Sequence, residues 1–245
     1  MERITSRTNP RVQLARSLRE GKHRRQTGLH FVEGDKLVQE ARLSGAELMT
    51  VFIREGYTGE LDFPCEVLLV TDSVMESLCL SNTPQALCAT VKTPALSLPE
   101  QMAGPVLLLE DLQDPGNVGT LIRTADALGA GCVILSPRCA DPFSPKTLRS
   151  SMGSVYHLPM WVGEIPAALQ LLRDQGYTCL CGHLQGSETL PEKTDKMALL
   201  VGNEGNGVSD RAAALCYTYR LPMSGKAESL NAAVFGAILL YELTR

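Results

Sequence analysis

The chain has 245 residues, of which 44% are hydrophobic and 20% are charged, and its formal net charge is −4. This composition excludes an intrinsically disordered chain, and the length is enough for one large domain or two small ones. No apolar stretch approaches the ~20 residues of a membrane-spanning helix, and the N-terminus lacks the apolar core of a secretory signal. We therefore expect a cytoplasmic protein with no membrane partner.

A basic segment opens this acidic chain. Eight arginines and lysines lie between residues 3 and 25, and only Glu20 opposes them. Pro10 can begin a helix, and Val12, Ala15 and Leu18 recur at helical spacing, so several arginines should point outward. Such a face can neutralise RNA phosphates, and a solvated helix face without a partner is an equally good interpretation.

Short apolar strands alternate with helical stretches between residues 28 and 91. The pattern predicts strands at 29–33, 48–53, 67–70 and 87–91, with helices at 36–43 and 73–80. This order indicates a small α/β unit. Pro94, Pro99 and Pro105 then interrupt a stretch with little apolar periodicity, which is typical of a linker between domains.

The second half of the chain alternates more strictly. Apolar strands are predicted at 106–109, 132–135, 177–181 and 198–201, and helices at 117–128, 165–173 and 229–243. Fully apolar strands separated by helices are typical of a parallel sheet that helices cover on both sides. The closing helix has an apolar face made of Leu230, Val234, Ala237, Ile238 and Tyr241.

The eight cysteines are scattered along the chain. Cys179 and Cys181 are the nearest pair, and no second pair is placed to complete a zinc site. We expect reduced, mostly buried thiols and no metal centre.

Three polar segments follow strands of the predicted parallel sheet. In the first, Asp114-Pro115-Gly116 form a turn that leads into a helix carrying Asn117 and Arg123. A helix cap and a surface salt bridge would explain these two residues equally well. Because open α/β folds bind ligands beyond the carboxyl ends of their strands, all three segments are candidates for one site.

The second segment is a glycine-rich loop with Gly202, Gly205 and Gly207 around Glu204. It lacks the lysine of a phosphate-binding P-loop and the glycine order of a dinucleotide site. Glu204 would repel a phosphate but not a cation such as a sulfonium. The third segment, residues 221–231, is a polar turn before the last helix, and Ser229 and Asn231 also fit simple helix caps.

In order, spacing and content, the three segments resemble the signature motifs of the SpoU (TrmH-like) RNA ribose 2′-O-methyltransferases of the SPOUT superfamily. The resemblance covers residues 105–245. Residues 1–92 look like the substrate-binding domain of the ribosomal-RNA branch, through the runs at 4–10 and 31–34. The expected domains are thus 1–92 for RNA binding, 93–104 as linker and 105–245 for methyl transfer.

The resemblance implies a parallel sheet whose C-terminal part forms a trefoil knot, a homodimer, and S-adenosylmethionine as cofactor. It implies that the cofactor contacts Gly202, Gly207, Leu221, Met223 and Leu230. It implies functional roles for Asn117, Arg123, Glu204, Ser229 and Asn231. RNA contacts are expected from Arg7, Arg11, Lys22, Arg24 and Arg25. One departure is that Ala232 and Ala233 follow Asn231, where the family usually has Val-Ser.

The expected reaction is methylation of a ribose 2′-hydroxyl, most simply in 23S ribosomal RNA. Because a guanidinium stays protonated in proteins, we expect Arg123 to bind phosphate and stabilise oxygen charge rather than act as a base. Glu204 would orient Arg123 or Asn117. The alternatives are a transfer-RNA methyltransferase, or a catalytically silent RNA-binding or assembly factor. A nucleotide-dependent oxidoreductase lacks its glycine fingerprint here.

Overall fold

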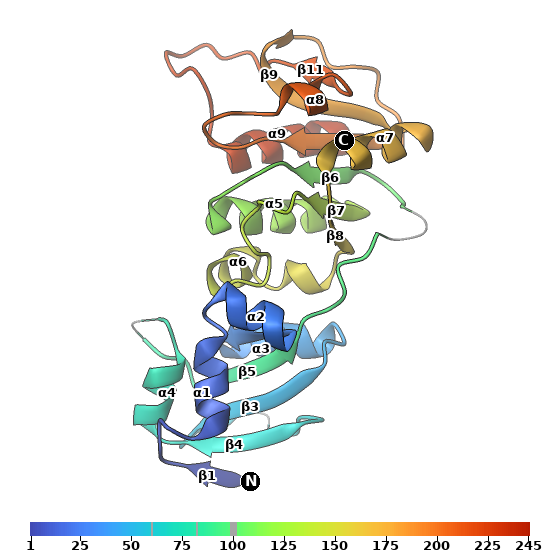
Figure 1. Ribbon diagram of the computed structural model, residues 1–245. Helices are drawn as coiled ribbons and strands as arrows, with labels where there is room; N and C mark the ends of the chain where they lie inside the picture. The colour runs from blue at the N-terminus through green and yellow to red at the C-terminus, as the bar shows by residue number, and fades with distance from the viewer. Residues whose placement is uncertain (60, 82, 99–101) are drawn as a thin grey trace. The chain divides into compact units, whose positions relative to one another are not determined.

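The computed structural model describes residues 1–59, 61–81, 83–98 and 102–245. The chain divides into two compact units (Figure 1). The first contains Met1–Ala95 and Phe143–Tyr156, and the second contains Leu96–Pro142 and His157–Arg245. Residues 99–101 of the predicted linker lie outside the described residues.

The first unit is built on a mixed five-stranded sheet of order β1-β4-β3-β5-β2. β1, β4 and β3 run parallel to one another, and β5 is antiparallel to both β3 and β2. Its elements are β1 (Glu2–Ile4), α1 (Pro10–Ser17), α2 (Gly21–Thr27), β2 (Leu29–Glu33), α3 (Asp35–Leu43), β3 (Leu48–Arg54), β4 (Glu66–Val70), α4 (Asp72–Leu78), β5 (Leu87–Lys92), α6 (Pro145–Ser151) and the short 3-10 helix η1 (Ser154–Tyr156).

Local sequence explains the first helix of this unit. Asn9 caps α1, because its Oδ1 accepts a hydrogen bond from the Arg11 N–H at 2.9 Å, and Pro10 occupies the first helical position. Val12 and Ala15 are buried in one core cluster with Phe31 and Phe52. The predicted helix beginning at Pro10 is confirmed.

The segment Phe143–Tyr156 is far along the chain but packs in this first unit. His30 is fully buried, and its Nε2 lies 2.6 Å from the Tyr156 hydroxyl and its Nδ1 3.1 Å from Thr93 Oγ1. The His30 ring also contacts Phe143, with centroids 4.8 Å apart. Burial, with a smaller contribution from the Arg24 charge, lowers the pKa of His30 to about 3, so this anchoring imidazole is neutral.

The second unit is a six-stranded parallel sheet of order β11-β9-β10-β6-β7-β8. The predicted α/β class with a parallel sheet is confirmed. The elements are β6 (Val106–Leu109), α5 (Pro115–Ala127), β7 (Cys132–Leu135), β8 (Met160–Val162), α7 (Ile165–Asp174), β9 (Thr178–Ser187), β10 (Met197–Val201), α8 (Asp210–Ala213), β11 (Tyr217–Tyr219) and α9 (Ala232–Thr244). The pattern had not predicted β8, which has only three residues.

Helices cover both faces of this sheet. On one face, Leu108, Ile134 and Leu200 form a core cluster with Leu169 and Leu172 of α7. Because side chains alternate along a strand, their neighbours point to the opposite face. There α5 and α9 pack against each other so closely that a Cβ on Gly236 would lie 2.5 Å from Leu121 Cδ2.

The closing helix differs from its prediction. It begins at Ala232, not at residue 229, because Asn231 is its N-cap. The expected apolar face is largely exposed, with Val234 at 49%, Ile238 at 37% and Tyr241 at 48%, whereas Ala233, Gly236, Leu239, Leu240 and Leu243 are buried. An almost wholly apolar helix carries no polar face by which periodicity could identify its inner side.

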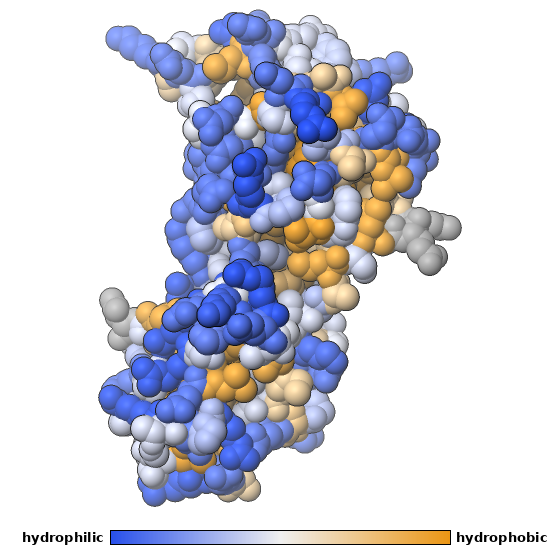
Figure 2. Space-filling view, viewed as in Figure 1, coloured by the Kyte–Doolittle hydropathy of each residue, from blue (hydrophilic) through white to orange (hydrophobic). Residues whose placement is uncertain are grey.

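The visible face of each unit is mostly hydrophilic, with apolar residues in smaller patches (Figure 2). Within the described ranges, no helix has the length and apolar character needed to cross a membrane. Five of the eight free cysteines are buried, which confirms the prediction of mostly buried thiols. The same described part of the chain contains no group of three His, Cys, Asp or Glu residues able to hold a metal ion.

Candidate active site

The candidate site lies where β6 and β10, two neighbouring central strands, end. From β6 the chain continues to β7 and β8 on one side of the sheet, whereas β10 and β9 lie on the other side. A change of direction of this kind opens a crevice at the carboxyl edge of a parallel sheet. The loop at 110–114 and the glycine loop at 202–208 meet there.

Three predicted residues are joined by hydrogen bonds at this edge. Asn117 Nδ2 donates to Glu204 Oε1 at 2.9 Å, and Asn231 Nδ2 donates to Asn117 Oδ1 at 3.0 Å. Asn117 lies in the first turn of α5 and Asn231 caps α9. The close packing of α5 on α9 thus brings the two amides together. Glu204 had been expected to orient either Arg123 or Asn117, and it bonds to Asn117.

Glu204 is held as an anion by donors from the neighbouring loop. Its two carboxylate oxygens also accept from the backbone N–H groups of Gln113 and Asp114, each at 3.2 Å. Burial raises the pKa of Glu204, but the hydrogen bonds from Asn117 and the backbone outweigh it and leave the pKa below its ordinary value. At neutral pH this carboxylate is therefore an acceptor and not an acid.

The glycine loop folds back on itself. The backbones of Asn203 and Gly207 exchange hydrogen bonds of 3.0 and 2.9 Å, and Gly207 has a φ of +69°. A Cβ on Gly202 would lie 2.4 Å from the carbonyl of Gly207. Both glycines are therefore needed for this turn, and the loop offers backbone, with no side chain in between, to a ligand.

The third segment is an exposed loop. Residues 220–231 have no regular secondary structure, and Met223 and Leu230 are both partly exposed although apolar. Ser229 is exposed and makes no hydrogen bond within the part of the chain that the structure describes. The structure therefore brings Asn231 to Asn117 and Glu204 but leaves Ser229, Leu221, Met223 and Leu230 available for a ligand.

Arg123 lies on the exposed surface of α5, six residues beyond Asn117. Among the described residues it forms no hydrogen bond and no ion pair. Its guanidinium is therefore free to meet an anion. The alanines after Asn231 do not disturb the cap, because Asn231 Oδ1 accepts from the backbone N–H groups of Ala233 and Val234, at 2.9 and 3.2 Å.

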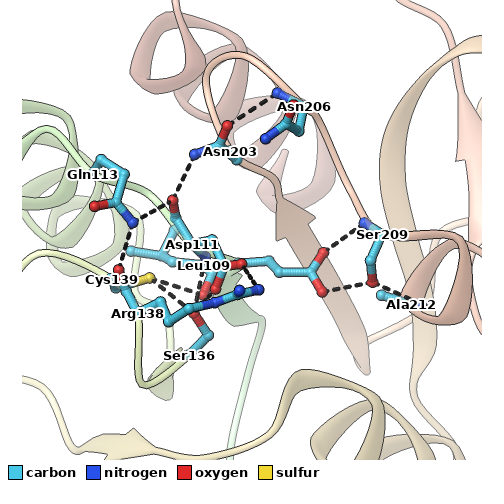
Figure 3. Close-up of polar contacts among 11 residues, drawn as sticks. Leu109, Asp111, Gln113, Ser136, Arg138, Cys139, Asn203, Asn206, Ser209 and Ala212 are labelled. Carbon is cyan, nitrogen blue, oxygen red and sulfur yellow. Dashed lines mark hydrogen bonds and ion pairs between the residues drawn. The ribbon is translucent and has the colours of Figure 1, made fainter.

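The residues that surround the first loop are not among the predicted site residues. Asp111 has a φ of +57°, and its carboxylate pairs with Arg138 and accepts from Ser136 Oγ at 2.6 Å (Figure 3). Glu110 is buried and accepts from the backbone N–H and hydroxyl of Ser209, at 2.8 and 2.7 Å. Their position directly after an apolar strand was the available signal, because charged residues there lie at the edge where ligands bind.

Family comparisons agree with this geometry. Residues 104–241 match the SpoU rRNA Methylase family, and residues 9–89 match the MRM3-like substrate binding domain. The chain belongs to the SpoU rRNA methylase family. The resemblance of the three segments is thereby confirmed.

Relatives of this family resemble the chain over its full length. A Bacillus subtilis protein named 23S rRNA (guanosine(2553)-2′-O)-methyltransferase RlmP is 35% identical over 250 residues, covering 99% of each chain. A crystal structure of an AdoMet-bound rRNA methyltransferase from Sinorhizobium meliloti has a TM-score of 0.87 at 32% identity, covering 99% of this chain and 97% of that one. The AdoMet complex of AviRb from Streptomyces viridochromogenes has a TM-score of 0.86 at 29% identity, covering 96% and 97%.

In this SpoU-family chain, the cations expected to contact RNA differ in their availability. Arg7 Nε donates to the carbonyl and hydroxyl of Ser73, at 2.9 and 3.1 Å, and Arg11 pairs with Glu66 at 2.7 Å. Arg24 is only 7% exposed, and its Nη1 donates to the carbonyls of Leu18 and Arg19, at 2.8 and 2.9 Å.

Lys22 and Arg25 remain the available cations of the expected set. Both are exposed, and neither has a hydrogen bond or ion pair within the described ranges. Arg24 instead holds the end of the first helix, because its buried guanidinium satisfies carbonyls that the helix leaves open. The buried Arg24 therefore does not belong to the surface that could meet RNA.

Proposed function

We propose that this protein methylates the 2′-hydroxyl of a ribose in RNA, with S-adenosylmethionine as methyl donor and 23S ribosomal RNA as substrate. The observation that carries the proposal is the hydrogen-bonded set of Glu204, Asn117 and Asn231 at the carboxyl edge of the sheet. Support comes from the full-length similarity to a protein named as a 23S rRNA 2′-O-methyltransferase.

The residues at this edge fit the proposed cofactor. The turn at Gly202 and Gly207 exposes backbone, and Leu221, Met223 and Leu230 supply apolar side chains. The ionised carboxylate of Glu204 suits a cationic ligand and would disfavour a phosphate. When bound, S-adenosylmethionine supplies the electrophilic methyl group. The protein has to hold the acceptor oxygen in line with that group and keep it reactive.

In this proposal, Arg123 acts on the acceptor. A guanidinium does not give up its proton in proteins. Arg123 would therefore bind the phosphate beside the target ribose and stabilise negative charge on the 2′-oxygen of that ribose. The 2′-hydroxyl proton would pass to a phosphate or to water. Ser229 would hydrogen-bond the ribose, while Asn117, Asn231 and Glu204 keep the edge in its bonded arrangement.

RNA binding would fall mainly to the first unit. Lys22 and Arg25 offer unpaired charge, and Arg7 and Arg11 would add to it once RNA displaces their present partners. We retain residues 1–92 as the substrate domain, 93–104 as linker and 105–245 as the methyltransferase domain. The segment Phe143–Tyr156 then belongs to the second domain in sequence but packs in the first unit.

We further propose a homodimer that acts in the cytoplasm. The exposed apolar side chains Val234, Ile238 and Tyr241 follow Asn231 along one face of α9, and an apolar stripe of this kind supports an interface between two copies of the chain. A trefoil knot in the C-terminal part of the sheet stays a prediction from the family. The sheet order, with β11 beside β9 rather than β10, is compatible with it.

The deciding experiment uses labelled S-adenosylmethionine and total RNA from a strain that lacks this protein. Methylated riboses are then mapped in the products. Label at one ribose of 23S ribosomal RNA is the expected result, and the Arg123→Lys variant should lose at least about tenfold in turnover because a bidentate contact is removed. Label in transfer RNA would overturn the substrate. Binding of RNA without transfer by the unaltered protein would favour the assembly-factor alternative.

A further inference from the structure

The backbone carbonyl of Asp111 is a meeting point of two loops (Figure 3). Asn203 Nδ2 donates to this oxygen at 2.8 Å and Gln113 Nε2 donates to it at 3.3 Å. Asn203 belongs to the glycine loop after β10, whereas Asp111 follows β6. The amide of Asn203 is therefore a side-chain bridge between the two loops that form the candidate site.

Asp111 adopts a backbone conformation that residues with a Cβ rarely take. Hydrogen bonds and an ion pair of its side chain stabilise this conformation. Its φ is +57°. Its carboxylate accepts from Ser136 Oγ at 2.6 Å and pairs with Arg138, while its own N–H donates to Ser136 Oγ at 2.9 Å. Unfavourable backbone conformations persist only where the surroundings impose them, and they cluster at functional sites.

The other end of the Asn203 amide organises its own loop. Asn203 Oδ1 accepts from the backbone N–H groups of Gly205 and Asn206, both at 3.0 Å. One amide therefore closes the turn through its oxygen and binds the neighbouring loop through its nitrogen. Among common side chains of this length, only an amide can donate and accept in this way.

The next residue makes the complementary contact. Glu204 accepts from the backbone N–H groups of Gln113 and Asp114. Two consecutive residues of the glycine loop therefore bind the loop after β6, Asn203 as a donor and Glu204 as an acceptor. The position of Glu204, and through it that of Asn117, then depends on where Asn203 holds the turn.

We infer that Asn203 is a positioning residue for the cofactor: through the Asp111 carbonyl, it fixes the turn at 202–207 in its binding arrangement before the cofactor arrives. This inference rests on the proposed function of the site. A loop held in place in the free protein costs less to order on binding, so the contribution should appear as cofactor affinity. RNA affinity should not depend on it.

The test is the dissociation constant of S-adenosylmethionine, measured by calorimetry on the full chain at pH 8.0, with RNA affinity measured by filter binding on the same proteins. Asn203→Asp keeps the acceptor for Gly205 and Asn206 but sets a carboxylate against the Asp111 carbonyl. We expect about tenfold weaker binding at pH 8.0. RNA affinity should stay within about threefold of that of the unaltered protein, because the contact between Asn203 and the Asp111 carbonyl serves the cofactor loop. Asn203→Ala should also bind the cofactor about tenfold more weakly, with RNA affinity unchanged.

Asn206→Ala is the matched control, because the side chain of Asn206 makes no hydrogen bond in the described part of the chain, and it should bind like the unaltered protein. Equal binding by Asn203→Asp and the unaltered protein at pH 8.0 would overturn the inference. An equal loss of cofactor and RNA affinity that accompanies a fall in melting temperature would also overturn it, since that is a purely structural effect. Failure of the unaltered protein to bind the cofactor would instead reject the proposed function.

Discussion

The Asn117 amide meets the Glu204 carboxylate at 2.9 Å, although the two residues are 87 positions apart in the chain. This contact joins the first turn of α5 to the loop after β10. A second amide, from Asn231, completes the set at the start of α9. Three segments from distant parts of the chain thus share one hydrogen-bonded network. Its central acceptor is the Glu204 carboxylate, which receives three donors, so the network should be most sensitive to substitution there.

Glu204→Gln should lower kcat/KM by about 100-fold, equivalent to about 2.7 kcal/mol. The amide nitrogen that replaces one carboxylate oxygen would face N–H groups that now lack an acceptor. Steady-state methylation with S-adenosylmethionine and RNA measures the effect. Glu192→Gln, on an exposed residue, is the control and should retain full activity. Full activity in Glu204→Gln would remove Glu204 from the site.

Gly202→Ala should abolish detectable cofactor binding or weaken it by more than about tenfold. The new Cβ would lie 2.4 Å from the Gly207 backbone, so the turn must open. Gly205→Ala is the matched variant, since its Cβ would approach only Asn203 Oδ1, at 3.6 Å. Calorimetric titration of both proteins separates them. If both variants lost affinity equally, the tight turn at Gly202 would not be the cause.

The pH dependence of folding stability should report His30. Its pKa in the folded protein is lowered to about 3, whereas the unfolded chain takes up a proton near pH 6.5. Below pH 6.5 the unfolded state binds more protons than the folded state. The free energy of unfolding should therefore decrease as the pH is lowered, by up to about 1.4 kcal/mol per pH unit, until the pH approaches the pKa of His30 in the folded protein.

Urea unfolding at pH 7.0, 6.0 and 5.5 measures this effect. His30→Gln should be destabilised at pH 7.0, because it loses the packing and hydrogen bonds with Tyr156 and Thr93, and its stability should depend less on pH than that of the unaltered protein. His23→Gln, at a partly exposed histidine, should keep the original slope. Parallel curves for the unaltered protein and His30→Gln would show that His30 does not titrate as described.

Replacing Lys22 and Arg25 together by alanine should weaken RNA binding and reduce the slope of log K against log salt by about 1.5. Both cations are exposed and unpaired within the described residues, so they can release counterions from RNA. Filter binding between 50 and 200 mM salt gives the slope. Arg3→Ala is the control, because Arg3 lies outside the set expected to contact RNA and is paired with Glu55 at 2.6 Å. Cofactor affinity should be unchanged throughout, and an unchanged slope in the double variant would contradict the RNA surface.

Ile238→Asp should dissociate the proposed dimer. A charge at the middle of the exposed apolar stripe of α9 cannot be buried without a partner. Light scattering coupled to size-exclusion chromatography should give about twice the monomer mass for the unaltered protein and the monomer mass for the variant. Leu43→Asp, at another exposed apolar position, should leave the mass unchanged. A monomeric unaltered protein would reject the interface.

Local sequence determined much of this protein. Apolar runs at 106–109 and 132–135 give fully buried parallel strands, and Asn9 with Pro10 begins α1, because these outcomes depend on burial and capping within a few residues. The order of Asn117, Arg123, Glu204 and Asn231 was enough to indicate the family. The three-residue strand β8 was too short to leave a periodic signal. The packing of Phe143–Tyr156 in the first unit leaves no local signal either, because its contact with His30 spans 126 residues.

Only the tertiary structure decided which side of α9 is buried, that Glu204 bonds to Asn117 rather than to Arg123, and that Asn203 reaches the carbonyl of Asp111. It also decided that Arg24 serves a helix end while Lys22 and Arg25 face solvent. Periodicity and composition record how a residue partitions between water and an apolar core. They do not record which polar groups meet, because that depends on the strand order that places loops 90 residues apart at one edge of the sheet.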